Sequence, residues 1–476
     1  MARDSLADAH RKSESRRSFL VSGLLLARSL HAAPPSTSPE ARFLGFEQVG
    51  PLLKNCRLPL PKGFGGLEEE AIRREWPAWA RNRDLEIRSR LLRGEEDSLV
   101  NFVLFGVSFT DQPRIVPDDT ASVESATRLF QTRVQDFVEG VAAPGTNERL
   151  LWLKSLTSRG FSTATPSERQ RLGRYVLENI SRYFKEQDQF RANLNETLRT
   201  SDATTAFSAR SELYQDRGLS VDTDFRPNYA IQQALLAMKR QGKLTAVRRA
   251  AIIGPGLDFA DKNYGFDYYP LQTLQPFALI DALVRLKLAH TSDLHLTIFD
   301  ISSQTLDHLA RAIRLARSKQ PYTVQLVLDR TRSWNRDVLG YWHEFGNQLG
   351  VPVDPVPPPP GVRNVDSRAV RVRPEIVGAM EPRTLNPVLQ HLDLSADQRY
   401  DLVVATNVFI YYSAFEHVLA LLDIESMLAP RGVFLSNDLL QACPGVTLRS
   451  TGNVTVAYSD RASDSDRIEI YTRQVR

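Results

Sequence analysis

Two kinds of hydrophobic pattern divide the sequence near residue 240. Between residues 68 and 240, apolar residues recur three and four positions apart, which is typical of amphipathic helices. From residue 243 onward, short uninterrupted apolar runs alternate with amphipathic ones. Because strands of a parallel sheet are buried on both faces, this second pattern predicts a parallel sheet covered by helices. The chain is therefore expected to join a mainly helical domain, residues 34–240, to an α/β domain, residues 241–476.

The helical half contains one predicted helix start with a well-defined cap. Thr165 is followed by a proline and, three positions on, by Glu168. A capping hydroxyl, a proline in the first turn and an early acid are typical of a helix N-terminus. A further start is expected at Asp97 or Ser98, which would divide residues 85–105 between two helices.

Strands and helices are predicted to alternate along the second half. A terminal antiparallel hairpin is expected because two runs of strand type are joined by a polar, turn-rich loop. Four consecutive prolines within residues 351–361 predict a stiff surface insertion between strands. The predicted strands are 250–253, 295–299, 322–328, 402–405, 432–435, 454–458 and 467–471, and the predicted helices are 276–288, 303–318 and 415–428.

Composition and charge narrow the function classes. The chain has 476 residues, of which 42% are hydrophobic and 24% charged, so it is neither wholly disordered nor fibrous. The net charge is +4, but residues 1–33 hold six basic and three acidic side chains, which leaves the rest nearly neutral. That balance argues against a long nucleic acid as partner. Two cysteines, Cys56 and Cys443, exclude a CxxC zinc site and leave one disulfide bridge open.

Residues 1–33 resemble an export signal. Arg16 and Arg17 precede an apolar run at residues 21–30, and small residues and prolines follow it. Paired arginines in this position are similar to a twin-arginine signal; the alternative is a disordered basic N-terminus. The cleavage point stays open. The protein is thus expected to be exported, or periplasmic, if this leader is used, and cytoplasmic otherwise. No stretch predicts a transmembrane helix.

The central chemical signal follows the first predicted strand. Gly254, Pro255 and Gly256 come directly after residues 250–253. Glycines at such a turn let the backbone approach a ligand closely. The dinucleotide-binding version of this turn has a third glycine where this sequence has Phe259, which disfavours a nicotinamide oxidoreductase.

Polar residues also follow two later strands. Asp300 closes the strand at 295–299, where a carboxylate can accept both hydroxyls of a ribose; the alternative is that it caps the next helix. Asn407 follows the strand at 402–405. Because ligands of parallel sheets bind at the carboxyl ends of the strands, we expect Gly254, Asp300 and Asn407 to converge.

In this order the motifs resemble those of class I S-adenosylmethionine-dependent methyltransferases. The resemblance covers residues 245–476 and implies an α/β fold with a Rossmann-like seven-stranded sheet that ends in an antiparallel hairpin. It also implies S-adenosylmethionine as cofactor and methyl transfer as the activity. It is carried by Gly254-Pro255-Gly256, by Asp300, by the strand and aromatic residues of 401–412, and by the turn Pro430-Arg431-Gly432.

The resemblance implies roles for individual residues. Gly254 and Gly256 would line the methionine end of the cofactor. Asp300 would hold the ribose, and Asn407 would lie beside the sulfonium, where the acceptor arrives.

The sequence also departs from the family pattern. Ile252 stands where the family often has an acid, so Asp258 would supply the carboxylate for the cofactor amino group, or else the site is degenerate. The acid that reads the adenine is either Asp329, after the strand at 322–328, or Asp393.

Catalytic residues are not assigned, because methyl transfer from a sulfonium depends mainly on alignment and needs a base only for a protonated nucleophile. His417 is expected on a helix surface. The sequence contains no metal-ligand motif and no serine elbow. The candidates for lining the substrate pocket are Tyr268, Tyr269, Tyr411 and Tyr412.

The acceptor is not identified, although a small molecule is favoured, and the oligomeric state stays open. S-adenosylmethionine is made in the cytoplasm, which conflicts with an exported enzyme. The alternative is therefore a non-catalytic, exported binding protein on a degenerate methyltransferase scaffold.

Overall fold

The computed structural model describes residues 39–56, 60–61, 63–115, 123–158, 160–200, 218–219, 225–260, 266–441, 443–461 and 464–474. The chain divides into two units, Met1–Glu40 and Ala41–Arg476, and all the described helices and strands belong to the second. The predicted leader and its cleavage point lie outside the described residues.

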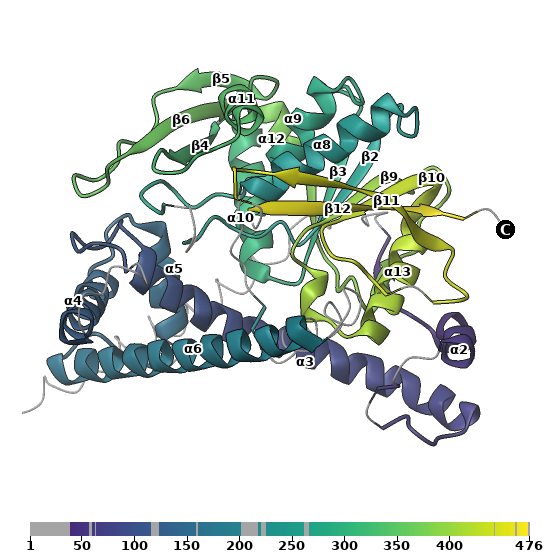
Figure 1. The fold of residues 1–476 in the computed structure, drawn as a ribbon, viewed down its shortest axis with the longest axis horizontal. Helices are drawn as coiled ribbons and strands as arrows, with labels where there is room; N and C mark the ends of the chain where they lie inside the picture. Colours follow the sequence, from purple (N-terminus) through teal and green to yellow (C-terminus); the bar gives the residue numbers. More distant parts are fainter. Residues whose placement is uncertain are drawn as a thin grey trace, which may run out of the picture. The chain divides into compact units, whose positions relative to one another are not determined.

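A seven-stranded sheet, in the order β11-β12-β10-β9-β2-β3-β7, forms the centre of the C-terminal half (Figure 1). The five strands from β10 to β7 run parallel, whereas β12 pairs antiparallel with both β10 and β11. This arrangement confirms the predicted Rossmann-like seven-stranded sheet with its terminal antiparallel hairpin. The strands are β2 (Arg249–Ile253), β3 (His295–Asp300), β7 (Met380–Thr384), β9 (Tyr400–Ala405), β10 (Leu428–Ser436), β11 (Leu448–Ala457) and β12 (Ser465–Arg473).

Successive residues of the central strands enter two different cores, because side chains alternate between the faces of a sheet. Ile252 pairs with Ile298 and Val404, and all three pack with α8 (Arg226–Arg240), α9 (Gln275–Arg285) and α10 (Ser303–Arg317). Ile253 packs on the other side, with α13 (Ala414–Met427) and residues of the N-terminal helices. Burial on both faces explains why these strands contain uninterrupted apolar runs.

One predicted strand belongs to a different sheet. The run expected at 322–328 is β4 (Tyr322–Asp329), which pairs antiparallel with β6 (Val365–Val372) in a three-stranded sheet completed by β5 (Gly350–Val353). Its expected place in the main sheet is taken by β7, whose sequence Met-Glu-Pro-Arg-Thr has no apolar run. A proline is tolerated there because β7 is an edge strand.

The Pro-rich stretch lies between β5 and β6, within the segment that separates α10 from β7. Two helices also belong to this segment, α11 (Arg336–Glu344) and α12 (Pro374–Gly378). A two-stranded antiparallel sheet joins β1 (Ala41–Phe43) to β8 (Gln390–Leu392).

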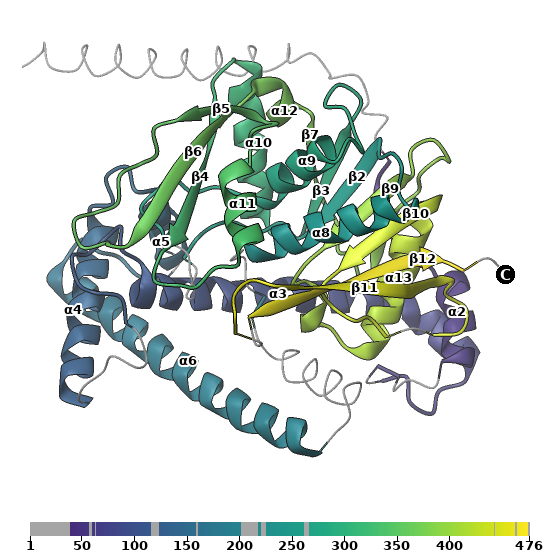
Figure 2. The ribbon, with the colours of Figure 1, turned by 45° about the horizontal axis from the view of Figure 1, so that its top comes forward.

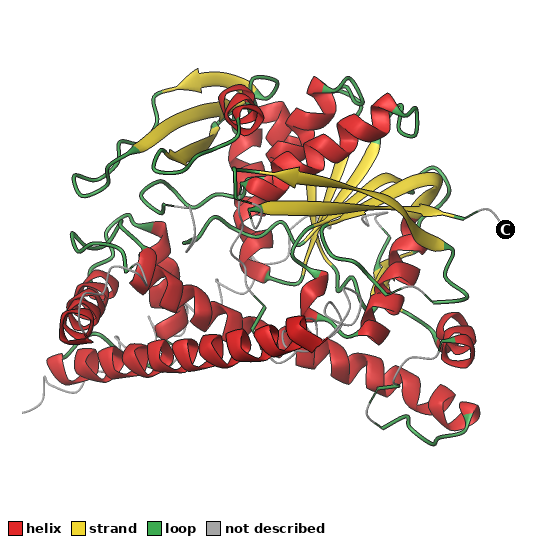
Figure 3. Ribbon diagram, in the orientation of Figure 1, coloured by secondary structure: helices red, strands yellow, loops and turns green. Residues whose placement is uncertain are grey.

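The N-terminal half is helical (Figure 3). Figure 1 and Figure 2 show that one end of α3 lies beside α4, α5 and α6, and that its other end lies beside α2. The helices are α2 (Phe46–Asn55), α3 (Glu69–Phe105), α4 (Val123–Ala142), α5 (Glu148–Thr157) and α6 (Pro166–Thr200). In the described part of the chain, no helix is both long and apolar enough to cross a membrane.

The two predicted helix starts have opposite outcomes. Glu168 donates its backbone N–H to the Thr165 hydroxyl at 3.3 Å and accepts from the Thr165 N–H at 3.1 Å, so this cap is confirmed. The start expected at Asp97 or Ser98 is wrong, because α3 continues through both residues. Asp97 pairs instead with Arg182 of α6 at 2.9 Å, and Ser98 is buried.

A disulfide joins Cys56, which follows α2, to Cys443, which lies between β10 and β11. Their Cα atoms are 5.5 Å apart, within the usual range for a bridge. The bridge that the sequence left open is therefore formed, and it fastens the N-terminal helices to the sheet.

Candidate active site

A pocket lies at the carboxyl ends of β2, β3, β7 and β9. Four of the five predicted cofactor-binding residues line it, together with both tyrosines that follow β9. Its lining also includes apolar residues from the N-terminal half. The lining includes Leu91, Leu219, Gly254, Gly256, Gln275, Asp300, Ile301, Leu385, Thr406, Asn407, Tyr411 and Tyr412.

The turn after β2 requires its glycines. Gly254 and Gly256 have φ angles of +64° and +67°, in the left-handed region that residues with a Cβ rarely adopt. A Cβ added to Gly254 would also lie 2.8 Å from a methyl carbon of Val408. The Gly254 N–H donates to the Phe299 carbonyl at 2.8 Å, which fixes the turn beside β3. The backbone of this turn is thus exposed to the pocket without side chains.

Asp300 brings a buried carboxylate to the pocket. It accepts the Ser302 N–H at 2.8 Å and, among the described residues, has no ion-pair partner. Burial raises its pKa to about 6, although hydrogen bonds from the backbone of Ser302 and Ile301 oppose the shift. The alternative role as a helix cap is wrong, because the N-cap of α10 is Ser302, whose hydroxyl accepts the Thr305 N–H.

Asn407 forms a reciprocal pair with Asn437, which follows β10. The Asn407 N–H donates to the Asn437 side-chain oxygen at 2.7 Å, and the Asn437 amide donates back to Asn407 at 2.8 Å. Asn407 has a φ of +59° and is exposed at the pocket. Asparagine tolerates this conformation better than most residues, and strained backbone of this kind is common at functional sites. The sequence analysis missed Asn437, whose contribution depends on contact between two strands.

Gln275 is a second residue that the sequence analysis missed. It begins α9, is buried, and donates its side-chain amide to the Thr406 hydroxyl at 2.8 Å. Both residues line the pocket. The local signal was a polar residue directly before the apolar run at residues 276–280.

Three predicted site residues lie elsewhere in the described structure. The Asp258 carboxylate accepts from the Gln272 side-chain amide at 2.7 Å, and it does not line the pocket. The Tyr268 hydroxyl bonds to Ser367 of β6 at 2.7 Å. Tyr269 is buried beneath an arginine of α5. The long loop after the glycine turn therefore leads these residues away from the pocket.

Neither acid proposed to read the adenine reaches the pocket lining. Asp329 ends β4 in the smaller sheet, where it accepts from the N–H and hydroxyl of Thr331. Asp393 pairs with Arg42 at 2.7 Å. At the end of β7, the strand beside β3, Leu385 lines the pocket instead.

His417 was expected on a surface, but it is buried inside α13. It donates its Nε2 proton to the Phe409 carbonyl at 2.8 Å, and burial lowers its pKa. It therefore holds the turn after β9 rather than contacting solvent.

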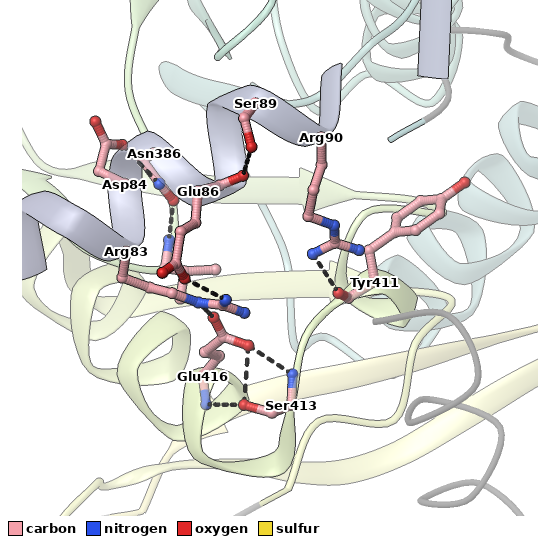
Figure 4. A network of polar contacts seen from close by, with 10 residues as sticks. Arg83, Asp84, Glu86, Ser89, Arg90, Asn386, Tyr411, Ser413 and Glu416 are labelled. Carbon is pink, nitrogen blue, oxygen red and sulfur yellow. Dashed lines mark hydrogen bonds and ion pairs between the residues drawn. The ribbon is translucent and has the colours of Figure 1, made fainter. Parts of the chain in front are cut away.

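The helical half forms one wall of the pocket. Leu91 of α3 and Leu219 both line it, and the Leu219 N–H donates to the Arg90 carbonyl at 3.1 Å. Polar contacts from α3 also reach the loops after β7 and β9 and the first turn of α13 (Figure 4). These contacts are Asp84 to Asn386 at 2.8 Å, Arg90 to the Tyr411 carbonyl at 3.0 Å, and Arg83 to Glu416 at 2.7 Å.

No protein-family model and no curated protein matches the sequence. Several solved methyltransferases are similar in structure. The glycopeptide N-methyltransferase MtfA, in complex with S-adenosylmethionine, aligns over 53% of this chain and 69% of its own, with 10% identity and a TM-score of 0.21. The CcbJ methyltransferase from Streptomyces caelestis aligns over 52% and 96%, with 12% identity and a TM-score of 0.26.

The magnesium protoporphyrin IX methyltransferase from Synechocystis PCC 6803, with bound S-adenosylmethionine, aligns over 60% of this chain and 94% of its own, with 10% identity and a TM-score of 0.24. Sequence identities and TM-scores this low carry no conclusion about function.

Proposed function

We propose that this protein binds S-adenosylmethionine and transfers its methyl group to an acceptor, for which a small molecule is favoured. The observation that carries the proposal is the convergence, in a single pocket at the strand ends, of two left-handed glycines and one buried carboxylate that has no ion-pair partner within the described part of the chain. These groups fit the cofactor, since the turn at Gly254 has no room for a side chain and Asp300 can accept two hydroxyls. The cofactor would supply an already activated methyl group.

The strand order β7-β3-β2-β9 supports one orientation of the cofactor. Asp300, at the end of β3, would accept the ribose hydroxyls. The adenine would then lie toward β7, where Ile301 and Leu385 offer apolar walls, and the amino-acid part toward β2 and β9. Asn407 would lie at the acceptor side.

Gln275 is the residue we propose for the cofactor amino group. Its amide nitrogen is used by Thr406, which leaves the carbonyl oxygen to accept from an ammonium group. Asp258 is a weaker candidate for this role because its carboxylate is engaged by Gln272. No general base is proposed: burial raises the pKa of Tyr412, so its phenol stays neutral.

Calorimetric titration of the purified protein tests this function. We expect micromolar binding of S-adenosylmethionine and S-adenosylhomocysteine, and weaker binding of S-adenosylhomocysteine to Gln275→Leu. Methylthioadenosine lacks the amino-acid part, so its affinity should not change in Gln275→Leu. Equal losses for both ligands would remove Gln275 from the amino-acid site, and no binding of any ligand to the folded protein would contradict the cofactor assignment.

The second candidate is a non-catalytic binding protein on the same scaffold. It is favoured by Asp258, whose engagement with Gln272 leaves no carboxylate at the expected amino-group position. This candidate predicts a folded protein that binds neither S-adenosylmethionine nor its demethylated product.

We also propose that the protein is exported to an oxidising compartment after it has folded and bound S-adenosylmethionine in the cytoplasm. The disulfide between Cys56 and Cys443 supports this, because such bridges are rare in reducing cytoplasm. The paired Arg16 and Arg17 favour the same conclusion. Fusion of residues 1–40 to a reporter tests it: export should be lost when both arginines are replaced by lysine. The helical half is proposed to cap the pocket, supported by Leu91 and Leu219 in its wall.

A further inference from the structure

The loop after the glycine turn is held by a buried arginine of the helical half. Arg149, in the first turn of α5, is only 2% exposed. Its guanidinium donates to the carbonyls of Asp258 and Phe259, each at 2.6 Å, and also to the carbonyl of Tyr269. One side chain thus joins the two ends of this loop, because a guanidinium presents several donors in a rigid plane.

The same loop also enters the hydrophobic core of the helices. The ring of Phe259 packs against Trp152 of α5 and Phe102 of α3, with centroid distances of 4.5 and 5.7 Å. This packing accounts for phenylalanine at the position where a dinucleotide-binding turn would have a third glycine. The residue contributes to the core of the helices instead of opening space for a phosphate.

A second anchor fixes the far side of the loop. Asp267 is buried, and its carboxylate accepts the N–H groups of Val107 and Ser108 at 2.6 and 3.2 Å and the Ser108 hydroxyl at 2.6 Å. Three side chains therefore attach the loop to the helical half. They are Arg149 of α5 and, from the loop itself, Asp267 and Phe259.

We propose that Arg149 is a positioning residue for the cofactor turn and couples the packing of the helical half to cofactor affinity. Gly254 and Gly256 have no side chains of their own to hold them, and the chain leaves the pocket wall only two residues later, at Asp258. By holding the carbonyls of Asp258 and Phe259, Arg149 keeps the preceding turn in its ligand-facing conformation. The effect on affinity rests on the proposed function, whereas the effect on the turn does not.

Arg133 of α4 provides a matched control. It is also fully buried and also donates to backbone carbonyls, including those of Val103 at 2.7 Å and Gln112 at 2.8 Å. The four carbonyls that accept from Arg133 within the described structure all belong to the helical half. Replacing either arginine removes comparable hydrogen bonds, but of the two only Arg149 donates to the loop after the glycine turn. Arg133 attracts Asp267 of that loop by its charge, which R133K retains.

The first test compares R149K with R133K in the full chain. Both are titrated with S-adenosylhomocysteine at a temperature well below their unfolding midpoints. We expect the dissociation constant to rise about tenfold or more in R149K, because a lysine ammonium cannot span three carbonyls, and to change less than about twofold in R133K. An unchanged constant in folded R149K, or equal rises in both variants, would overturn the proposal.

The second test needs no ligand. Hydrogen exchange of the amides of residues 254–260 should be faster in R149K than in the parent protein and unchanged in R133K. Unchanged exchange in R149K contradicts the positioning role even if cofactor binds. Conversely, faster exchange in a protein that binds no S-adenosylhomocysteine would refute the proposed function and leave the role of Arg149 standing.

A milder pair of variants covers the case in which R149K does not fold. F259L keeps an apolar side chain but loses the ring contact with Trp152, and F137L makes the same change at a core position that contacts Phe102 and Phe109. F259L should weaken S-adenosylhomocysteine binding severalfold, whereas F137L should bind like the parent protein. Equal affinities in the two variants would count against the coupling.

Discussion

The buried carboxylate at the pocket and the buried arginines of the helical half are used in opposite ways. In the sheet half, Asp300 is buried with no ion-pair partner among the described residues, and its raised pKa reflects that environment. In the helical half, Arg133 and Arg149 are buried with their donors directed at backbone carbonyls. A buried charge whose hydrogen-bonding capacity is only partly filled can bind a ligand, whereas one whose donors are used holds the backbone.

The two halves therefore contribute differently to the site. The ends of β2, β3 and β9 present the groups that would contact a cofactor, and these groups come from short segments near the strand ends. The helical half adds few polar groups to the lining, but its contacts reach the loops after β2, β7 and β9. A loss of affinity without a lost contact to ligand is therefore the expected signature of changes in the helices.

Asp300→Ala tests the sheet half most directly. Loss of two hydrogen bonds from a charged acceptor, each worth about 1.5–3 kcal/mol, should weaken S-adenosylmethionine binding by about 100-fold or more. Calorimetric titration measures the change. Asp329→Ala, which alters an acid of the smaller sheet, is the control and should bind normally. Unchanged affinity in Asp300→Ala would defeat the ribose assignment.

Gly254→Ala should produce the next largest effect. A left-handed φ and the close approach to Val408 each oppose a Cβ, at a cost of about 1–3 kcal/mol for the backbone alone. The turn should move, and cofactor affinity should fall about tenfold or more. Gly378→Ala adds a methyl group in open space and serves as the control in the same titration. Normal binding by Gly254→Ala would mean that the turn does not face the ligand.

The pH dependence of binding sharpens the role of Asp300. In the proposed site the carboxylate would accept ribose hydroxyls, and its pKa of about 6 means that it becomes protonated as the pH falls through that value. Affinity for S-adenosylhomocysteine should therefore be constant above pH 7 and fall by up to about tenfold per pH unit below the pKa. The slope should disappear in Asp300→Asn. A slope that persists in this variant would assign the titration to another group.

Leu91→Ala should have the smallest effect. Leu91 lines the pocket from α3, and its truncation removes apolar contact without touching the three polar bonds that α3 makes to the loops after β7 and β9 and to α13. We expect a two- to threefold rise in the dissociation constant, on the order of 0.5 kcal/mol. Exposed Leu85 of the same helix is the control. A loss as large as that of Asp300→Ala would contradict the division between the two halves.

Much of the α/β half was predictable because its elements follow from local patterns. Strands β2, β3, β9 and β10 and the terminal hairpin all lie where apolar runs predicted them. β7 was not predictable, since an edge strand needs no apolar run, and β4 was assigned to the wrong sheet because its run looks the same in either one. The glycine turn and Asp300 were found because short spacings along the chain carry their signal.

The residues whose positions were predicted wrongly make contacts between distant segments. Asp258 is engaged by Gln272, Tyr268 by Ser367, and His417 by the turn after β9. Each looked available in the sequence, because a side chain's partner is invisible until the chain has folded. The same reason hid Gln275 as a lining residue.

Periodicities along the chain identified most of the helices and strands of the α/β half and the turn where the backbone must be free of side chains. The folded chain settles which polar groups stay open to the pocket and which are consumed by packing, because burial and hydrogen-bond satisfaction are properties of neighbours in space. Phe259 is an example. The sequence shows a phenylalanine where a dinucleotide-binding turn would have a glycine, but only the folded chain shows that its ring lies in the core of the helices.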